Sequence, residues 1–274
     1  MSMADIIFKE NCRHILKNGV SDAGQAVRPK WQDGTPAHTI RVFGMVNNYD
    51  LSAEFPALTL RRVRLKNCID EVLWIWQKKS NNVHDLNSKI WDAWADESGS
   101  IGKAYGYQLA QKHTYPEGEF DQVDRILYDL KHNPASRRII ASMYNHSQLH
   151  EMALYPCAYS LTLGVLDGRL NAILNQRSQD FLTANNWNVC QYAALVHMFA
   201  AASGLQAGVL THVIADAHIY DRHIPIVEEL LEKEPRPAPV FRMEKKDFYA
   251  FTPEDFSLEN YAPHPFKHEI QVAV

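Results

Sequence analysis

The sequence predicts an α+β protein, a single domain over residues 1–274 in which helices cover one large mixed β-sheet. Segments with helical and with strand-like patterns follow one another without a regular βαβ alternation. No repeat, low-complexity segment or long linker divides the chain. An apolar content of 46% with 22% charged residues is ordinary for a globular protein, and 274 residues can bury a substantial core.

Apolar residues recur at helical spacing in four segments of the chain. The first segment ends before Gly19, and the second carries an apolar stripe from Leu65 to Trp76. The third runs up to Gly204 and the fourth stops before Pro235, so that glycine and proline mark their ends. The predicted helices cover residues 4–18, 65–76, 188–202 and 225–232.

Short apolar or alternating runs predict five strands. Two of these runs flank Asp167-Gly168, a dipeptide that favours a tight hairpin turn. The tail that follows Pro235 is punctuated by prolines, and we expect it to be irregular. The predicted strands cover residues 38–46, 139–144, 159–165, 170–175 and 209–214.

Charge and cysteine usage narrow the class of function. A net charge of −4 and a pI near 6.3 argue against a general nucleic-acid binder, which carries a basic excess. The cysteines at positions 12, 68, 157 and 190 form no CxxC pair, so we expect neither a zinc site nor a disulfide framework, and no other metal. The N-terminus lacks a signal-peptide pattern, and no stretch reaches the roughly 20 apolar residues of a membrane span. We therefore expect a cytoplasmic protein that does not bind membranes.

One part of the sequence gathers the residue types of covalent nucleotide chemistry. Cys157 follows a proline, and a cysteine thiolate can add to an electron-poor carbon. Arg177 and Ser178 are suited to holding a phosphate, and the Asn188 amide can read a donor–acceptor edge such as that of uracil. A lone cysteine is nevertheless more often a small buried hydrophobe than a nucleophile. Arg177, if it lies beside Cys157, would lower the pKa of the thiol.

Three further polar features are ambiguous when each is taken alone. Arg137-Arg138 precedes an apolar run; such pairs are usually a solvated face, but paired arginines also suit a phosphate dianion. Glu71 lies beside the apolar stripe of its helix, either as the polar margin or, if buried, as a proton relay with a raised pKa. Tyr105 lies in a glycine-flanked loop, from which a phenol could point into a cleft.

The order and spacing of these motifs resemble the folate-dependent thymidylate synthase family that uses a nucleophilic cysteine. The resemblance extends from about Asp33 to Val274, and its Pro-Cys and Gln-Arg-Ser elements are the most specific. It implies the thymidylate synthase fold, with one large mixed sheet covered by helices. The matching stretches are residues 55–59, 70–74, 90–95, 105–106, 136–140, 152–157, 176–180, 188, 218–220 and 272–274.

The resemblance implies a methyltransferase that converts dUMP to dTMP with 5,10-methylenetetrahydrofolate as co-substrate and gives dihydrofolate. In the family, the thiolate that matches Cys157 adds to carbon 6 of uracil, and carbon 5 then attacks the one-carbon unit of the folate. Glu71 matches the acid that organises proton transfers, and Tyr105 matches the phenol near the proton-abstraction step. Asn188 matches the amide that binds uracil. These four are the implied catalytic residues.

The resemblance also implies a set of substrate-binding residues. Arg177 and Ser178 match ligands of the phosphate, and Asp180 belongs to the same substrate-binding motif. His218 and Tyr220 match the pair that binds the 3′-hydroxyl, which favours a deoxynucleotide.

Two further implications concern the folate and the assembly. Asp180 and Trp91 match folate contacts, and the terminal Val274 is expected to close over the folate like a lid. Arg137 and Arg138 match a pair that crosses a dimer interface into the partner's site, which implies a homodimer.

Some positions depart from the family pattern. The family has a phosphate-binding arginine directly before the segment that matches residues 33–39, but no arginine stands there; Arg28 and Lys30 are both candidates to replace it. Asn188 disfavours cytosine, because a carboxylate would be the acceptor that cytosine needs. The other departures are Ala158, residues 184–187 and residues 214–215.

Two alternative functions stay open at the level of sequence. One is a pyrimidine nucleotide 5-hydroxymethylase on the same fold, in which water rather than hydride captures the exocyclic methylene. The other is a non-catalytic nucleotide- or RNA-binding homologue. The intact set of implied catalytic residues and the acidic net charge speak against the second, while RNA binding alongside catalysis stays open.

Overall fold

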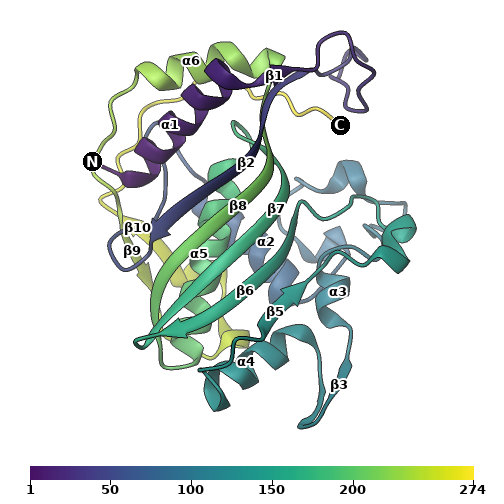
Figure 1. Ribbon diagram of the computed structural model, residues 1–274, viewed down its shortest axis with the longest axis vertical. Helices are drawn as coiled ribbons and strands as arrows, with labels where there is room; N and C mark the ends of the chain where they lie inside the picture. Colours follow the sequence, from purple (N-terminus) through teal and green to yellow (C-terminus); the bar gives the residue numbers. More distant parts are fainter.

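A six-stranded mixed sheet forms the frame of the computed structural model, which describes residues 1–274 (Figure 1). Every neighbouring pair in the sheet is antiparallel except β7 and β8, which run parallel. The α+β class expected from the sequence is therefore confirmed. In sheet order the strands are β1 (Val20–Ser21), β2 (Thr39–Asp50), β8 (Gln206–Tyr220), β7 (Arg169–Asp180), β6 (Ala158–Leu166) and β5 (Ile139–Ser142).

The parallel pair is joined by the long helix α5 (Asn185–Ala202), which makes a βαβ unit at the centre of the fold. This single unit does not make a regular βαβ alternation, so the expectation from the sequence holds. The unit matters for function, because β7 ends and α5 begins beside each other and carry two of the predicted motifs. Asp180 is the last residue of β7, and Asn188 lies in the first turn of α5.

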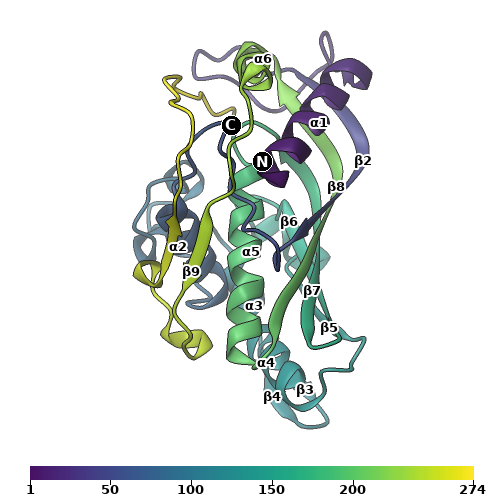
Figure 2. The ribbon, with the colours of Figure 1, turned by 90° about the vertical axis from the view of Figure 1, so that its left-hand side faces the viewer.

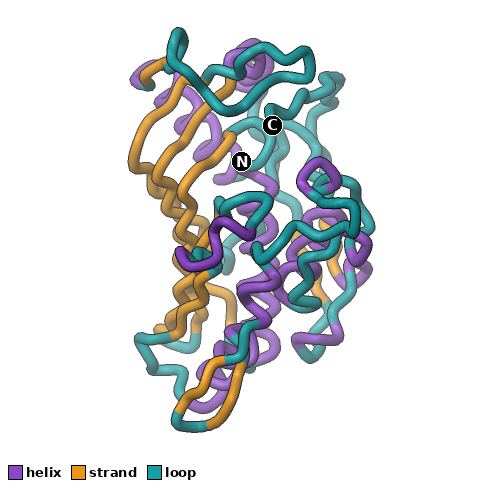
Figure 3. Tube along the Cα trace, turned by 90° about the vertical axis from the view of Figure 1, so that its right-hand side faces the viewer, coloured by secondary structure: helices purple, strands orange, loops and turns teal.

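The helices gather on one side of the sheet, and its other side is left uncovered (Figures 2 and 3). Helix α1 ends where the backbone N–H of Gly19 donates to the carbonyl of Ile15, as the glycine stop predicts. The four predicted helices are confirmed, and two more are present. Besides α5, the helices are α1 (Met3–Asn18), α2 (Leu65–Trp76), α3 (Gly106–Ala110), α4 (Gln122–His132) and α6 (Ile224–Glu232). Short 3₁₀ helices lie at Val83–Asp85, Asp92–Trp94, His146–Glu151, Asp221–His223, Phe248–Ala250 and Pro253–Asp255.

The predicted hairpin joins β6 to β7, and its two turn residues have φ values of +49° at Asp167 and +71° at Gly168. Such left-handed pairs match the twist of an antiparallel hairpin. Strands β2 and β8 are longer than predicted. Each continues through polar residues, because the two strands pair with each other by backbone hydrogen bonds along this stretch. Two small hairpins were not predicted: β3 (His113–Tyr115) with β4 (Gly118–Phe120), and β9 (Val240–Met243) with β10 (Phe256–Glu259). The second lies in the tail, so the expectation of an irregular tail is wrong there.

One continuous hydrophobic core of 62 buried residues fills the space between the sheet and the helices. The indoles of Trp74 and Trp76 on α2 are fully buried in this core. The uncovered side of the sheet is different, because large apolar side chains there face solvent: Phe43 is 86%, Val46 59% and Ile140 53% exposed. None of the helices combines the length and the apolar character that a membrane span requires.

Candidate active site

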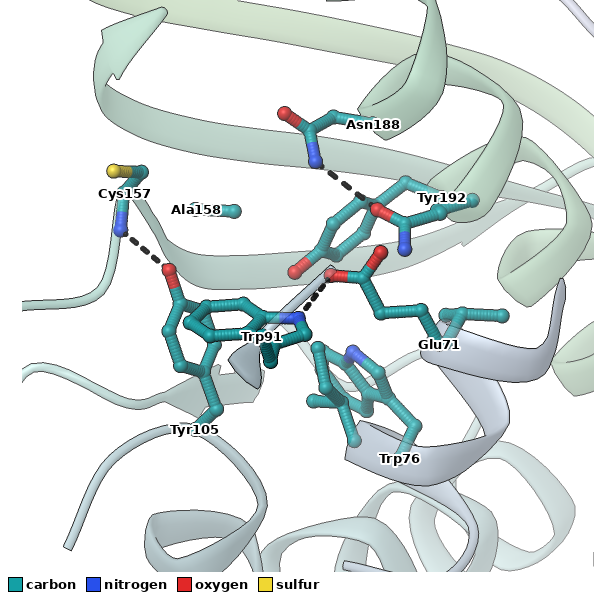
Figure 4. Close-up of a pocket in the computed structure, with 11 residues that line it drawn as sticks. Glu71, Trp76, Trp91, Tyr105, Cys157, Ala158, Asn188 and Tyr192 are labelled. Carbon is teal, nitrogen blue, oxygen red and sulfur yellow. Dashed lines mark hydrogen bonds between the residues drawn. The ribbon is translucent and has the colours of Figure 1, made fainter. Parts of the chain in front are cut away.

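A pocket opens between α2, α5 and the start of β6, and it brings together the four side chains implied as catalytic (Figure 4). Apart from these polar groups, its walls are mostly apolar and aromatic. Such a lining, with a few polar groups that converge, is typical of a small-molecule site. The lining residues are Glu71, Val72, Ile75, Trp76, Trp91, Tyr105, Cys157, Ala158, Asn188, Gln191 and Tyr192.

Cys157 lies directly before β6 and is half-buried. Its backbone N–H donates to the Tyr105 hydroxyl at 3.0 Å, and the Nη2 atom of Arg177 lies 3.5 Å from its Sγ. The guanidinium is held in place because it also donates to the carbonyls of Tyr155 at 2.6 Å and Pro156 at 3.1 Å. Burial raises the pKa of the Cys157 thiol, whereas the charge of Arg177 and a hydrogen bond with Tyr105 act to lower it.

Tyr105 stands at the first turn of α3 in a strained backbone conformation, with φ +46° and ψ −105°. The next residue, Gly106, has no room for a side chain, because a Cβ there would lie 2.3 Å from the carbonyl oxygen of Ser80. The Tyr105 ring packs edge-on against Trp91, with ring centroids 5.2 Å apart. Close packing on both sides therefore holds the phenol under Cys157 (Figure 4).

Glu71 projects from α2 into the pocket and is only 6% exposed. Its two carboxylate oxygens accept from the indole N–H groups of Trp91 at 2.9 Å and Trp187 at 2.5 Å. Burial raises the pKa of this carboxyl group, and the two indole hydrogen bonds oppose the rise. A carboxyl with a raised pKa that is anchored on both oxygens is suited to hand a proton to a ligand in the pocket.

Asn188 lies among three buried glutamines. Its Oδ1 accepts from Gln176 Nε2 at 3.2 Å and from Gln179 Nε2 at 3.4 Å. Its Nδ2 donates to Gln191 Oε1 at 3.0 Å, the hydrogen bond marked at Asn188 in Figure 4. Both lone pairs of Oδ1 are therefore engaged within the chain, whereas Nδ2 has one more N–H with which to bind a ligand.

Ser178 and Asp180 lie on the last residues of β7, beyond Arg177. The Asp180 carboxylate accepts from the backbone N–H groups of Leu182 at 2.9 Å and Thr183 at 3.1 Å, and so fixes the turn into α5. Burial by itself would raise the pKa of Asp180, but a hydrogen bond and the charge of His223 outweigh it and lower the pKa. Asp180 therefore stays ionised and shapes this end of the site.

His218 and Tyr220 lie at the end of strand β8, with their ring centroids 5.1 Å apart. Burial raises the pKa of both Cys157 and Tyr220, and the positive charge of Arg28 opposes the rise at both. The charge of Arg28 thus acts on both the nucleophile and Tyr220. Lys30, the other candidate, instead pairs its backbone with the last residue of the chain.

The backbone pairing of Lys30 with Val274 positions the C-terminus. The N–H of Lys30 donates to the carbonyl of Val274 at 2.8 Å, and the N–H of Val274 donates back to Lys30 at 3.1 Å. The tail before it is also held, since the Gln271 carbonyl lies 2.8 Å from His223 Nε2. The lid movement expected of Val274 stays a prediction.

Arg137 and Arg138 do not reach the pocket of their own chain. Both are exposed, directly before the edge strand β5, and neither side chain has a partner within the chain. Two free guanidinium groups at the edge of an uncovered sheet face agree with a role across an interface, which stays a prediction.

Sequence reasoning assigned no role to four polar residues that the structure brings to the site: Trp187, Gln191, Gln176 and Gln179. Gln191 was discoverable, because it follows Asn188 by three residues on a helix and so shares its face. Gln176 and Gln179 flank Arg177-Ser178 in a recognised motif. Nothing in the sequence indicated that Trp187 donates to Glu71.

Comparison with known proteins agrees with this geometry. The family model for thymidylate synthase matches residues 6–274. The chain is 43% identical to thymidylate synthase of Bacillus mojavensis and to thymidylate synthase 1 of Bacillus subtilis (strain 168), over 281 aligned positions covering 100% of each chain. The chain belongs to the thymidylate synthase family. A solved structure titled thermostable thymidylate synthase A from Bacillus subtilis superposes with a TM-score of 0.94 at 42% identity, covering 98% of this chain and 99% of that one.

Membership in the thymidylate synthase family confirms the resemblance seen in the sequence and the fold it implies. The protein is an enzyme, a methyltransferase that methylates dUMP to dTMP and uses a folate co-substrate. A hydroxymethylase and a non-catalytic homologue, the two alternatives left open by the sequence, are not favoured.

Proposed function

We propose that this thymidylate synthase works through a covalent bond between Cys157 Sγ and carbon 6 of dUMP, with 5,10-methylenetetrahydrofolate as the one-carbon donor. The observation that carries the proposal is the position of Cys157, which faces a pocket beside Arg177, above Tyr105 and within reach of groups that bind a base. The other three cysteines lie in helices and are fully buried, so Cys157 is the cysteine that can meet a substrate.

Addition of the thiolate to carbon 6 moves the ring electron pair toward carbon 5 and oxygen 4, which makes carbon 5 nucleophilic. Arg177 favours the thiolate because its charge lies 3.5 Å from Sγ. The Asn188 amide binds oxygen 4 with Nδ2, where charge develops.

Glu71 and Tyr105 serve the proton transfers. Glu71 exchanges a proton with oxygen 4 through water, since its carboxyl has a raised pKa and lies deep in the pocket. Tyr105 lies beside Cys157 and assists removal of the carbon 5 proton. The folate supplies the methylene carbon and the hydride that reduces it to methyl.

The rest of the nucleotide lies toward the ends of β7 and β8. Arg177, Ser178 and Arg28 hold the phosphate. Arg28 replaces the arginine that is missing before residues 33–39, since its charge acts on Cys157 and Tyr220. His218 and Tyr220 bind the 3′-hydroxyl.

The residues around the pocket fit a flat folate ring. The Trp91 indole lines the pocket, and it is held there because its N–H donates to Glu71 and its ring packs edge-on against Tyr105 and Trp94. The Asp180 carboxylate accepts hydrogen bonds from the turn into α5, and its remaining lone pairs contact the folate. The terminal carboxylate of Val274 closes the site when the folate is present.

We also propose a cytoplasmic homodimer that pairs through the uncovered face of the sheet. Phe43, Val46 and Ile140 are exposed on that face, and an apolar surface of this kind marks an interface. Arg137 and Arg138, at the start of β5, then enter the partner's phosphate site. Four unpaired cysteines agree with a reducing compartment.

A mixing experiment tests the crossing arginines. Cys157→Ser and Arg138→Ala proteins are each expected to be inactive or nearly so as homodimers. Mixed dimers regain one site that has both the nucleophile of one chain and the arginine of the other. Recovered dTMP formation on subunit exchange supports the crossing, and its absence shows that each arginine serves its own chain.

The reaction itself is tested by incubating the protein with dUMP and 5,10-methylenetetrahydrofolate. Dihydrofolate is followed by its near-ultraviolet absorbance, and the nucleotide is identified by mass. A methylated nucleotide with dihydrofolate is the expected result. Tetrahydrofolate with a hydroxymethylated nucleotide would contradict the proposal.

A further inference from the structure

Two indoles hold the carboxylate of Glu71, one on each oxygen. Trp91 directly precedes the 3₁₀ helix Asp92–Trp94 and donates to Oε1 at 2.9 Å, whereas Trp187 lies in the first turn of α5 and donates to Oε2 at 2.5 Å. Trp91 lines the pocket, but Trp187 does not. Trp187 also falls within residues 184–187, where the chain departs from the family pattern. The hydrogen bond to Glu71 is therefore what links Trp187 to the site.

The first turn of α5 is fixed to the segment that leads into α2, and this places the Trp187 indole. Asn186 is 3% exposed, and its Nδ2 donates to the carbonyl of Pro56 at 2.8 Å. Its Oδ1 accepts from the backbone N–H of Leu58 at 3.1 Å. Glu71 in turn projects from α2, which packs against α5. Backbone on both sides thus brings the indole N–H and the carboxylate together.

The chemistry of the indole limits where Glu71 can carry a proton. An indole N–H donates a hydrogen bond and cannot accept one. Each oxygen of Glu71 gives one lone pair to an indole, so a proton on the carboxyl must lie on one of the remaining lone pairs. Since the carboxyl lines the pocket, the two indoles direct its proton exchange away from themselves and toward the pocket.

The same hydrogen bonds influence how strongly Glu71 holds its proton. Burial raises the pKa of the carboxyl, the N–H groups of Trp91, Trp187 and Gln191 lower it, and the charge of Asp70 adds to the rise. The other titratable groups that act on Glu71 or are acted on by it are neutral near pH 7, because burial raises their pKa values. They are Cys68 on α2, Tyr105 at the start of α3 and Tyr192 on α5.

We propose that Trp187 is a positioning residue for proton transfer, whose N–H holds Oε2 of Glu71 so that the free lone pairs of the carboxyl face the nucleotide. The proposal rests on the proposed role of Glu71 in exchanging protons with oxygen 4. A phenyl ring in place of the indole would fill most of the same space but would give Oε2 no donor. Because Trp187 does not line the pocket, such a change should alter the carboxyl and leave the pocket walls in place.

The pKa of Glu71 is measured directly, so that the contact is tested without turnover. Protein with ¹³C in the side-chain carboxyl of its glutamates is titrated by NMR without ligands, and Glu71→Gln assigns the signal. In Trp187→Phe we expect the pKa of Glu71 to rise by about one to two units, because one hydrogen bond to a charged group is lost. Trp187→Met also lacks the N–H and should give the same rise, so the test stands if one of the two variants fails to fold.

Trp74→Phe is the matched control. The Trp74 indole is fully buried and packs beside Trp91, with ring centroids 5.8 Å apart, but its N–H donates to the carbonyl of Asn82. The same change of indole to phenyl at this position should leave the pKa of Glu71 where it is. An unshifted pKa in the Trp187 variants, or an equal shift in Trp74→Phe, would overturn the positioning role.

Kinetic measurements then connect the contact with the reaction. In Trp187→Phe, kcat for dTMP formation should fall roughly tenfold, a part of the 10²- to 10⁴-fold that general acid–base catalysis contributes, while KM for dUMP changes little. The ionisation in the pH profile of kcat that disappears in Glu71→Gln should move to higher pH by as much as the NMR value. A lower kcat with this ionisation unmoved would mean a merely structural role for Trp187. If the NMR value shifts but Glu71→Gln keeps full kcat, the contact stands, and the proposed role of Glu71 is wrong together with the use of Trp187 in the reaction.

Discussion

Replacing Arg177 with Gln should slow the reaction of Cys157 with alkylating reagents, because the guanidinium lies 3.5 Å from Sγ and stabilises the thiolate. The glutamine Nε2 corresponds to Arg177 Nε, which donates to the carbonyl of Pro156, so one of the two contacts with the local backbone can be kept. A charge pair at about 4 Å is worth roughly 1 kcal/mol in water and about 4 kcal/mol at the effective dielectric of a protein surface. The thiolate fraction below the thiol pKa should therefore fall by about 5- to 900-fold.

The observed rate should fall less steeply, since a thiolate of higher pKa is intrinsically more nucleophilic. With a Brønsted coefficient near 0.5, about half of the logarithmic effect survives, so the alkylation rate should fall by about 2- to 30-fold. Burial raises the pKa of the thiols of Cys12, Cys68 and Cys190, and all three are 0% exposed, so the reaction reports Cys157 alone.

Iodoacetamide incorporation followed by mass at several pH values measures this effect. Ser178→Ala is the matched control, because it removes a proposed phosphate contact from the neighbouring position without removing charge. It should alkylate like the unaltered protein. An Arg177→Gln protein with an unchanged rate and pH profile would refute the idea that Arg177 stabilises the thiolate.

Three other substitutions test the contacts that position the pocket residues. Tyr105→Phe leaves the Cys157 N–H without its acceptor and should destabilise the protein by about 1–3 kcal/mol, seen as a Tm lower by roughly 2–4 °C per kcal/mol; an unchanged Tm would show that this hydrogen bond is dispensable. Gly106→Ala places a Cβ 2.3 Å from the Ser80 carbonyl oxygen and should cost about 1–3 kcal/mol in urea unfolding, whereas Gly168→Ala, with open space, tests only the left-handed turn. Burial raises the pKa of Glu71 in the folded state, so its ionisation opposes folding. This penalty grows as the pH rises from the ordinary value of 4.5 to the raised pKa, and it vanishes below 4.5. The free energy of unfolding of Glu71→Gln relative to the unaltered protein should therefore rise as pH increases from 4.5, and a flat or falling difference would contradict the assignment.

Local patterns in the sequence were sufficient to predict the elements whose own residues carry the signal. The apolar stripe from Leu65 to Trp76, the glycine after α1 and the Asp167-Gly168 turn each specify an element through its own residues. Helix α4 had such a signal too, since Asp121 caps it by accepting from the N–H groups of Val123 and Asp124.

The extended part of β8 and the tail hairpin could not be read in the same way. Polar residues such as Asp216 and His218 interrupt the apolar pattern of β8, but backbone pairing with β2 continues through Tyr220. Strands β9 and β10 are short and are separated by residues 244–255, so only their pairing in the folded chain defines them. Tertiary contacts decide these elements, and no local pattern carries that information.

The residues of the site also fall into two groups, those that the sequence could indicate and those that only the fold brings together. Cys157, Glu71, Tyr105 and Asn188 were named from motifs, and the structure places all four around one pocket. The groups that orient them were not named, because their partners depend on the register of β7 against β8 and on which way an amide is turned. The sequence shows that Gln176 and His212 exist, but only the fold brings them within 2.8 Å.

A covalent bond from Cys157 to the nucleotide is the central claim, and trapping it is the most direct test. A dUMP analogue with fluorine at carbon 5 can accept the thiolate and the one-carbon unit, but it has no proton at carbon 5 to lose, so the adduct should persist. The protein mixed with this analogue and 5,10-methylenetetrahydrofolate should gain the mass of both molecules on the peptide that contains Cys157. A Cys157→Ser protein should gain neither. Turnover of dUMP by Cys157→Ser, or an adduct on any other residue, would contradict the account.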